Sequence, residues 1–99
     1  MMDIFKGKTI LVADDDPGNR ELVLSTMNGF VKDIKVLSAV DGGQVLEILR
    51  KRKVDAVLLD WEMPVMDGYT VLKKMRQTPA WKEIPVLMYT GVMTATNNL

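Results

Sequence analysis

The chain has 99 residues, which is the size of one small domain. Apolar residues make up 47% of it, as in an ordinary globular protein, and 13 Lys and Arg residues balance 13 Asp and Glu residues. The resulting net charge of zero predicts no direct binding to nucleic acid and no attraction to an acidic membrane. The chain contains neither Cys nor His, which excludes thiol enzymes, zinc proteases and His-dependent catalytic triads.

The apolar runs of the chain are too short for a membrane span. The longest are about six residues, whereas a spanning helix needs about 20. Residues 1–6 lack the apolar region of a signal peptide. The sequence therefore predicts a cytoplasmic protein with no membrane partner.

Four of the apolar runs predict β-strands, because they are short and consist mostly of aliphatic or β-branched residues. They occupy residues 9–13, 34–38, 54–59 and 85–89. None alternates strictly between apolar and polar positions, which is typical of strands buried on both faces of a parallel sheet. Pro79 and Pro85 enclose the loop before the last run, and we expect Trp81 to anchor that loop.

Three helical patterns separate the predicted strands. Asp16 can cap the first helix, with Pro17 at its first position, and the next two patterns follow Asp41 and Asp67. Each helix has one stripe of residues at helical spacing: Leu22, Val23, Thr26, Met27 and Phe30; Val45, Leu46 and Leu49; and Val71, Leu72 and Met75. A fourth helix is expected to begin near Val92.

This alternation of strands and helices predicts an α/β fold, a doubly wound parallel sheet with right-handed crossovers. The expected order across the sheet is second, first, third and fourth strand (2-1-3-4). No linker, internal repeat or low-complexity segment divides the chain, so residues 1–99 are expected to form one domain.

Acidic residues directly follow two of the predicted strands. Asp14, Asp15 and Asp16 come after the first strand, and Asp60 comes after the third. Because the carboxyl ends of parallel strands share one edge, we expect Asp14, Asp15 and Asp60 to converge there. Two carboxylates about 5 Å apart repel each other by roughly 3 kcal/mol at an effective dielectric of about 20, so such a group favours a cation. Oxygen ligands without His or Cys favour Mg²⁺ or Mn²⁺ over Zn²⁺.

Other roles are open to some of these acids. Helix capping is the role expected for Asp16, and Asp14 considered alone is equally compatible with a structural or solvated role. A calcium-binding loop of the EF-hand type does not fit, because the sixth residue counted from Asp14 is Asn19 and the twelfth is Ser25, where Gly and Glu are needed. A cation beside a spare carboxylate suits the acceptance of a phosphoryl group on Asp.

Three segments match those of a known protein family in order and spacing. They are residues 10–16 (ILVADDD), 58–68 (LLDWEMPVMDG) and 85–91 (PVLMYTG). With these segments, the chain resembles the receiver domain of bacterial two-component response regulators. The resemblance extends over nearly the whole chain but covers only the first four of the family's five βα units. It implies a flavodoxin-like receiver in which the fifth strand and the last helix are missing.

The resemblance implies a role for each candidate site residue. Asp60 would accept the phosphoryl group, and Thr90 would hydrogen-bond a phosphoryl oxygen. Asp15 would bind Mg²⁺ directly, Asp14 would hold a metal-bound water, and Asp60 and the backbone carbonyl of Glu62 would complete the protein ligands. The donor would be a phosphohistidine on a histidine kinase or a histidine phosphotransfer protein. Judged without the resemblance, Thr90 could simply close a strand, and the Glu62 side chain could be a solvated loop acid.

The chain departs from the family in one respect that bears on function. The family has a lysine at the end of its fifth strand, and this chain has no counterpart to it. Without that strand, residues 86–89 would form an exposed edge with unpaired backbone groups. We therefore expect a truncated or natural fragment, or a chain completed by another molecule through homodimerisation at this edge or strand exchange. Such a chain is expected to be oligomeric or weakly stable alone.

Three functions remain open at this point. The first is a signalling switch that promotes its own phosphorylation without independent enzymatic turnover, which the retained acids and Thr90 favour. The second is a pseudo-receiver or truncated fragment that acts only as a protein-interaction or dimerisation module, which the missing lysine favours. The third is a phosphoryl-transfer enzyme of the haloacid dehalogenase type, which Glu62 opposes because that class needs a second Asp two residues after the nucleophile.

Overall fold

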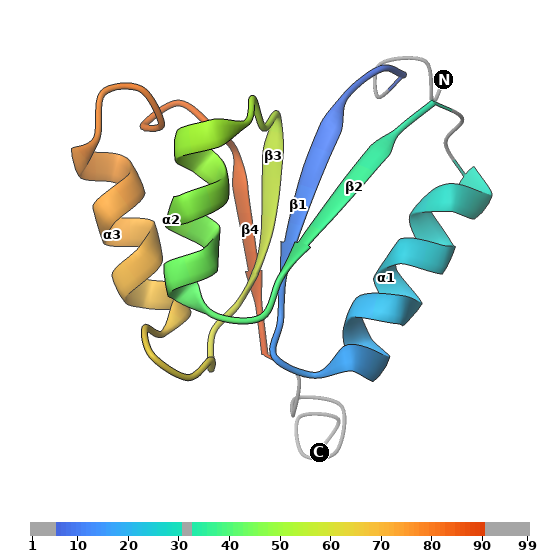
Figure 1. Cartoon of the computed structure of the whole chain (residues 1–99), viewed down its shortest axis with the longest axis horizontal. Helices are drawn as coiled ribbons and strands as arrows, with labels where there is room; N and C mark the ends of the chain where they lie inside the picture. Colours follow the sequence, from blue (N-terminus) through green and yellow to red (C-terminus); the bar gives the residue numbers. More distant parts are fainter. Residues whose placement is uncertain (1–5, 31–32, 91–99) are drawn as a thin grey trace.

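The structure is a computed structural model that describes residues 6–30 and 33–90, and it consists of strands alternating with helices (Figure 1). In chain order the elements are β1 (Thr9–Ala13), α1 (Pro17–Phe30), β2 (Lys35–Ala39), α2 (Gly42–Lys51), β3 (Ala56–Asp60), α3 (Gly68–Gln77) and β4 (Val86–Tyr89). The four expected strands and the first three expected helices are present. The fourth helix, expected near Val92, lies outside the described residues. In the described part, no helix has both the length and the apolar character of a membrane span.

The strands form one parallel sheet in the order β2-β1-β3-β4, which confirms the predicted doubly wound topology. At the end of β1, Ala13 lies beside Ala39 of β2 and Leu59 of β3. At the end of β3, Asp60 lies beside Tyr89 of β4. The carboxyl ends of β1, β3 and β4 are therefore level with one another at one edge of the sheet.

Helices cover both faces of the sheet. Figure 1 shows α1 on one side of the sheet and α2 and α3 on the other. The main core lies between the sheet and the pair formed by α2 and α3, where burial of apolar surface holds the layers together. Its buried members are Leu11, Ala13, Ala39, Val45, Leu46, Leu49, Val54, Val57, Leu59, Val71 and Met75. Trp81 packs against this core, as expected for the anchor of its loop.

The apolar stripes predicted for α2 and α3 face this core, but the stripe predicted for α1 is partly wrong. Leu22 is 66% exposed, whereas Val23, Leu24 and Met27 are half-buried. The covered side of α1 depends on how the helix packs on β1, which the spacing of its own apolar residues does not fix. Near the start of α1, Nη1 of Arg20 donates a hydrogen bond to the backbone oxygen of Asp14 over 2.7 Å.

Three aspartates cap the helices, as predicted. Asp16, Asp41 and Asp67 each accept a hydrogen bond of 2.7–2.8 Å from a backbone N–H two or three residues later. Such bonds satisfy N–H groups that have no partner within the helix. The hydrogen bond from the backbone of Thr70 also lowers the pKa of Asp67.

The loop between β3 and α3 holds the chain close to the end of β3. The backbone N–H of Gly68 donates to the carbonyl oxygen of Trp61 over 2.9 Å. In the middle of the loop, Val65 has a φ of 71°, which β-branched residues rarely adopt, and a hydrogen bond between its two neighbours closes a tight turn around it. The loop thus begins and ends beside the edge at which Asp60 lies.

Candidate functional site

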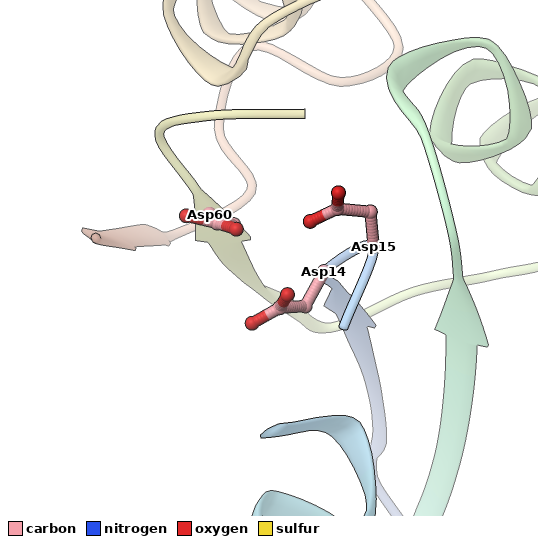
Figure 2. A group of neighbouring side chains, drawn as sticks. All are labelled: Asp14, Asp15 and Asp60. Atoms are coloured by element: carbon pink, nitrogen blue, oxygen red, sulfur yellow. The ribbon is translucent and has the colours of Figure 1, made fainter. Parts of the chain in front are cut away.

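The three aspartates predicted to converge lie together at the edge of the sheet (Figure 2). Asp14 and Asp15 directly follow β1, and Asp60 is the last residue of β3. One carboxylate oxygen of each lies within 4.8 Å of the others. The register explains this, because the pairing of Ala13 with Leu59 makes the residues that follow them level with each other.

The three carboxylates differ in burial but share a negative environment. Asp14 is fully buried, Asp60 is 4% exposed, and Asp15 is exposed. Two charges at this spacing repel each other by about 3 kcal/mol at an effective dielectric of about 20. Within residues 6–30 and 33–90, no Lys or Arg forms an ion pair with Asp14 or Asp15. The site therefore favours a divalent cation.

Asp14 is held by donors from three directions. Its Oδ1 accepts the backbone N–H of Asp16 over 2.9 Å, and its Oδ2 accepts the hydroxyl of Tyr89 over 2.6 Å. Its backbone oxygen accepts from Arg20, as described above. The bonds from Asp16 and Tyr89 satisfy the buried carboxylate, which would otherwise be costly to remove from water.

Tyr89 and Arg20 are residues of this site that the sequence alone does not identify. Tyr89 pairs with Asp60 in the sheet, and its hydroxyl reaches across β3 to Asp14. Burial raises the pKa of Tyr89, and the hydrogen bond to Asp14 and the nearby negative charges raise it further, so the hydroxyl keeps its proton. The only signal in the sequence is that Tyr89 ends an apolar run, and the face to which it points depends on the register.

An open pocket of about 440 Å³ surrounds the carboxylates. It has room for several waters, each of which takes about 30 Å³ in the liquid. Glu62 lies at this pocket, and its backbone N–H donates to Oδ1 of Asp60 over 3.3 Å. The lining residues are Asp14, Asp15, Asp16, Asn19, Asp60, Glu62, Met63 and Pro64.

Thr90 lies at the same edge of the sheet but lines a second pocket. It directly follows β4 and is half-buried. The second pocket, of about 680 Å³, is more apolar, and Glu62 lines both pockets. Its lining residues are Trp61, Glu62, Leu87, Met88, Tyr89 and Thr90. The structure thus brings the three aspartates together, with Glu62 beside them and Thr90 in the adjacent pocket.

The acidic group fits a hard cation such as Mg²⁺. All the donor atoms it offers are oxygens, which Mg²⁺ prefers. Oxygens bound to Mg²⁺ lie about 2.1 Å from it, so two such oxygens are at most about 4.2 Å apart. Separations of up to 4.8 Å suit a site in which some carboxylates bind the ion directly and others bind it through water.

Comparison with protein families gives a clear match. The model of the response regulator receiver domain matches residues 10–98. A probable cyclic di-GMP phosphodiesterase from Vibrio cholerae is 37% identical over 83 residues, which are 84% of this chain and 18% of that protein. The response regulator PleD from Caulobacter vibrioides is 35% identical over 83 residues, with the same two coverages. The chain thus spans about a fifth of the length of these curated relatives.

Solved structures show the same fold. The N-terminal domain of a response regulator receiver protein from Methanoculleus marisnigri has a TM-score of 0.75 and 36% identity, and the match covers 81% of this chain and 63% of that chain. The receiver domain of a sensor histidine kinase from Pseudomonas aeruginosa, which has a magnesium ion in its active-site cleft, has a TM-score of 0.79 and 24% identity, with coverages of 93% and 74%. The second likeness concerns the fold alone. Together with the family match and the observed topology, these findings show that the chain belongs to the receiver domains of two-component response regulators.

Proposed function

We propose that the chain is the phosphoacceptor domain of a two-component phosphorelay, in which Asp60 takes a phosphoryl group from a phosphohistidine. The donor would be a histidine kinase or a histidine phosphotransfer protein. One observation carries the proposal: the carboxylates of Asp14, Asp15 and Asp60 meet at the carboxyl edge of the sheet, with an oxygen of each within 4.8 Å of the others. Residues 1–99 would act as one receiver domain.

Asp60 is the nucleophile in this proposal. Its side chain is 4% exposed and stands at the end of β3, where the sheet fixes its position. One of its carboxylate oxygens would attack phosphorus while the bond from phosphorus to the imidazole nitrogen breaks. The electron pair of that bond returns to the imidazole of the partner, and an aspartyl phosphate forms on Asp60.

The bound cation would be Mg²⁺, with Mn²⁺ as an alternative. Asp15, Asp60 and the backbone carbonyl of Glu62 would bind it directly, and Asp14 would hold a metal-bound water. Two observations support this division: both oxygens of Asp14 already accept hydrogen bonds from protein groups, whereas Asp15 is exposed and accepts none from the described residues. When bound, the ion neutralises the carboxylates and the oxygens of the transferring group.

Thr90 would donate its hydroxyl to a phosphoryl oxygen. It directly follows β4 and so lies at the same edge of the sheet as Asp60. Fixed hydrogen-bond donors stabilise the negative charge on the oxygens of a transferring phosphoryl group, because such donors need no reorganisation during the reaction. The domain would act as a stoichiometric switch in the cytoplasm, with no turnover reaction of its own and no direct contact with nucleic acid.

A second candidate function is association with another protein, including a second copy of this chain. It is favoured by the outer edge of β4, since within the described residues β4 pairs only with β3. Leu87 of this strand is 65% exposed and lines the more apolar pocket. An open strand edge with apolar surface beside it suits edge-to-edge pairing.

Titration of Trp61 fluorescence with Mg²⁺ tests the proposed switch. Trp61 is next to Asp60 and 47% exposed, and a Trp81→Phe background leaves it as the only tryptophan. We expect Mg²⁺ to quench the fluorescence, and we expect Asp60→Asn and Asp15→Ala to abolish the response. Acetyl phosphate should then place a hydroxylamine-labile phosphate on the chain, and Asp60→Asn should prevent this.

Asp41→Asn is the matched control for these variants. Asp41 follows β2 at the same edge of the sheet but is not part of the acidic group, and Asn can also cap a helix. This variant should respond to Mg²⁺ and to acetyl phosphate as the parent chain does. A folded parent chain with neither a Mg²⁺ response nor a phosphate on Asp60 would contradict the switch and favour the association module.

A further inference from the structure

The hydrogen bond between Tyr89 and Asp14 spans the width of the acidic site. Asp60 and Tyr89 are paired in the sheet, and Asp14 is level with Asp60 on the other side. The Tyr89 hydroxyl passes Asp60 and donates to Oδ2 of Asp14 over 2.6 Å. One side chain of β4, which is separated from β1 by β3 in the described sheet, therefore reaches the acid that follows β1.

This bond completes a cradle around the carboxylate of Asp14. The backbone N–H of Asp16 holds the other oxygen over 2.9 Å, so neither oxygen is free to rotate away. The residue is fully buried, so the loss of one of these donors would leave a buried carboxylate oxygen without that hydrogen bond. The neighbouring carboxylate of Asp15 has no such fixation from the described residues.

We propose that Tyr89 is a positioning residue of the cation site, which acts by holding the Asp14 carboxylate in the orientation that a metal-bound water requires. The inference rests on the proposed function, because it concerns the same cation. A carboxylate fixed in advance loses little freedom when the ion binds. Removing an outer hydrogen-bond partner of this kind typically lowers metal affinity 10- to 100-fold.

The hydroxyl has a property that suits this role. It donates a hydrogen bond without adding charge, so it orients Asp14 and leaves the attraction of the site for a cation intact. A lysine or arginine at the same point would compete with the ion for the carboxylates. A phenol hydroxyl carries its proton at neutral pH, so Tyr89 can donate to Oδ2 of Asp14.

Isothermal titration with MgCl₂ of the parent chain and of Tyr89→Phe tests the inference. Phe keeps the ring and removes only the hydroxyl, so we expect the fold to remain and the Kd for Mg²⁺ to rise about tenfold. Tyr69→Phe is the matched control and should leave the Kd unchanged. It removes a hydroxyl from an exposed ring, whose centroid lies 5.9 Å from the ring centroid of Trp61. An unchanged Kd, or a lower one, in Tyr89→Phe would overturn the inference.

A double-mutant cycle tests whether Tyr89 acts through Asp14. In an Asp14→Asn background, Tyr89→Phe should change the Kd by less than about twofold, because the two changes remove one interaction. Additive effects would overturn the positioning role. If Tyr89→Phe does not fold, 3-fluorotyrosine in the parent sequence supplies the test: the ¹⁹F signal of residue 89 should shift on Mg²⁺ binding, and a signal that stays fixed during saturation would overturn the inference.

These results separate the inference from the function on which it rests. A parent chain that binds Mg²⁺ and is insensitive to the loss of the Tyr89 hydroxyl would retain the proposed function and refute only the role of Tyr89. A parent chain that binds no Mg²⁺ would refute both.

Discussion

Gly68 lies directly against the backbone of Asp60, so the first residue of α3 touches the last residue of β3. A Cβ added at Gly68 would lie 3.0 Å from Cα of Trp61 and 3.1 Å from the carbonyl carbon of Asp60, and it would overlap the carbonyl oxygen of Asp60. These are backbone atoms of a strand end, which cannot turn away as a flexible side chain can.

The first prediction is that Gly68→Ala lowers the free energy of unfolding by about 2 kcal/mol and weakens Mg²⁺ binding, because the strand end with Asp60 must shift. Gly29→Ala is the control. Gly29 is in α1 and would meet nothing within 4 Å, so alanine there should stabilise the protein by up to about 1 kcal/mol. Urea unfolding and Mg²⁺ titration of both variants provide the measurements, and equal effects would contradict the contact described.

The second prediction concerns the cap of α2. Asp41→Ala should cost about 1 kcal/mol of stability, because the backbone N–H of Gln44 loses the acceptor it has at 2.8 Å. Asp41→Asn should cost much less, since an amide oxygen can accept the same bond. Thermal or urea unfolding distinguishes the two variants. If alanine and asparagine were equally destabilising, the loss would come from charge and not from capping.

The third prediction concerns the backbone of Val65, which has a φ of 71°. Val65→Asn should raise the free energy of unfolding by about 1 kcal/mol, because Asn tolerates this region and a β-branched residue does not. Val40→Asn is a suitable comparison, since Val40 is also exposed but does not have a positive φ. Only the change at position 65 should stabilise the chain in urea unfolding.

The fourth prediction is a dependence of stability on alkaline pH. The pKa of Tyr89 in the folded chain is above the value of about 10 that it has in an unfolded chain. Above about pH 10 the unfolded state releases a proton that the folded state retains, so the free energy of unfolding falls as the pH rises. The stability that Tyr89 adds over Tyr89→Phe should therefore be full at about pH 8 and smaller at about pH 11. A difference that stays constant or grows over this range would be incompatible with a raised pKa.

The fifth prediction concerns the outer edge of β4. If copies associate there, Leu87→Lys should shift the chain toward monomer in sedimentation experiments, because a charge at a strand edge opposes pairing. Leu22→Lys is the matched control and should leave association unchanged. Leu22 is 66% exposed, close to the 65% of Leu87, but it lies on α1 and not at the strand edge. A chain that is monomeric at all accessible concentrations would refute association at this edge.

Local sequence patterns were sufficient to predict most of the fold and the acidic group. The strands, their order and the capping aspartates follow from short-range features and from general rules of parallel sheets. Asp14, Asp15 and Asp60 could be grouped because each stands at or just past a strand end, and those ends share one edge. These predictions needed no knowledge of side-chain packing.

Features that depend on contacts between elements could not be predicted in the same way. The buried face of α1 is offset from the predicted one, because Leu22 and Leu24 both fit a helical stripe and the docking of the helix decides between them. Tyr89 was predicted only as a strand residue, because its contact with Asp14 depends on the register of β4 against β3. That register is set by packing across the sheet.

Asp14, Asp60 and Tyr89 are aligned across three adjacent strands, so the proposed binding of Mg²⁺ would depend on the native register of the sheet. Side chains alternate between the two faces of a sheet, so a slip of one residue in β1, β3 or β4 would point one of these three groups to the opposite face. A chain with a misaligned sheet would keep its helical and strand content, but Asp14, Asp60 and Tyr89 would no longer lie together. Mg²⁺ added during refolding should therefore enrich chains whose strands are in native alignment, and spectroscopic measures of secondary structure would not detect the difference.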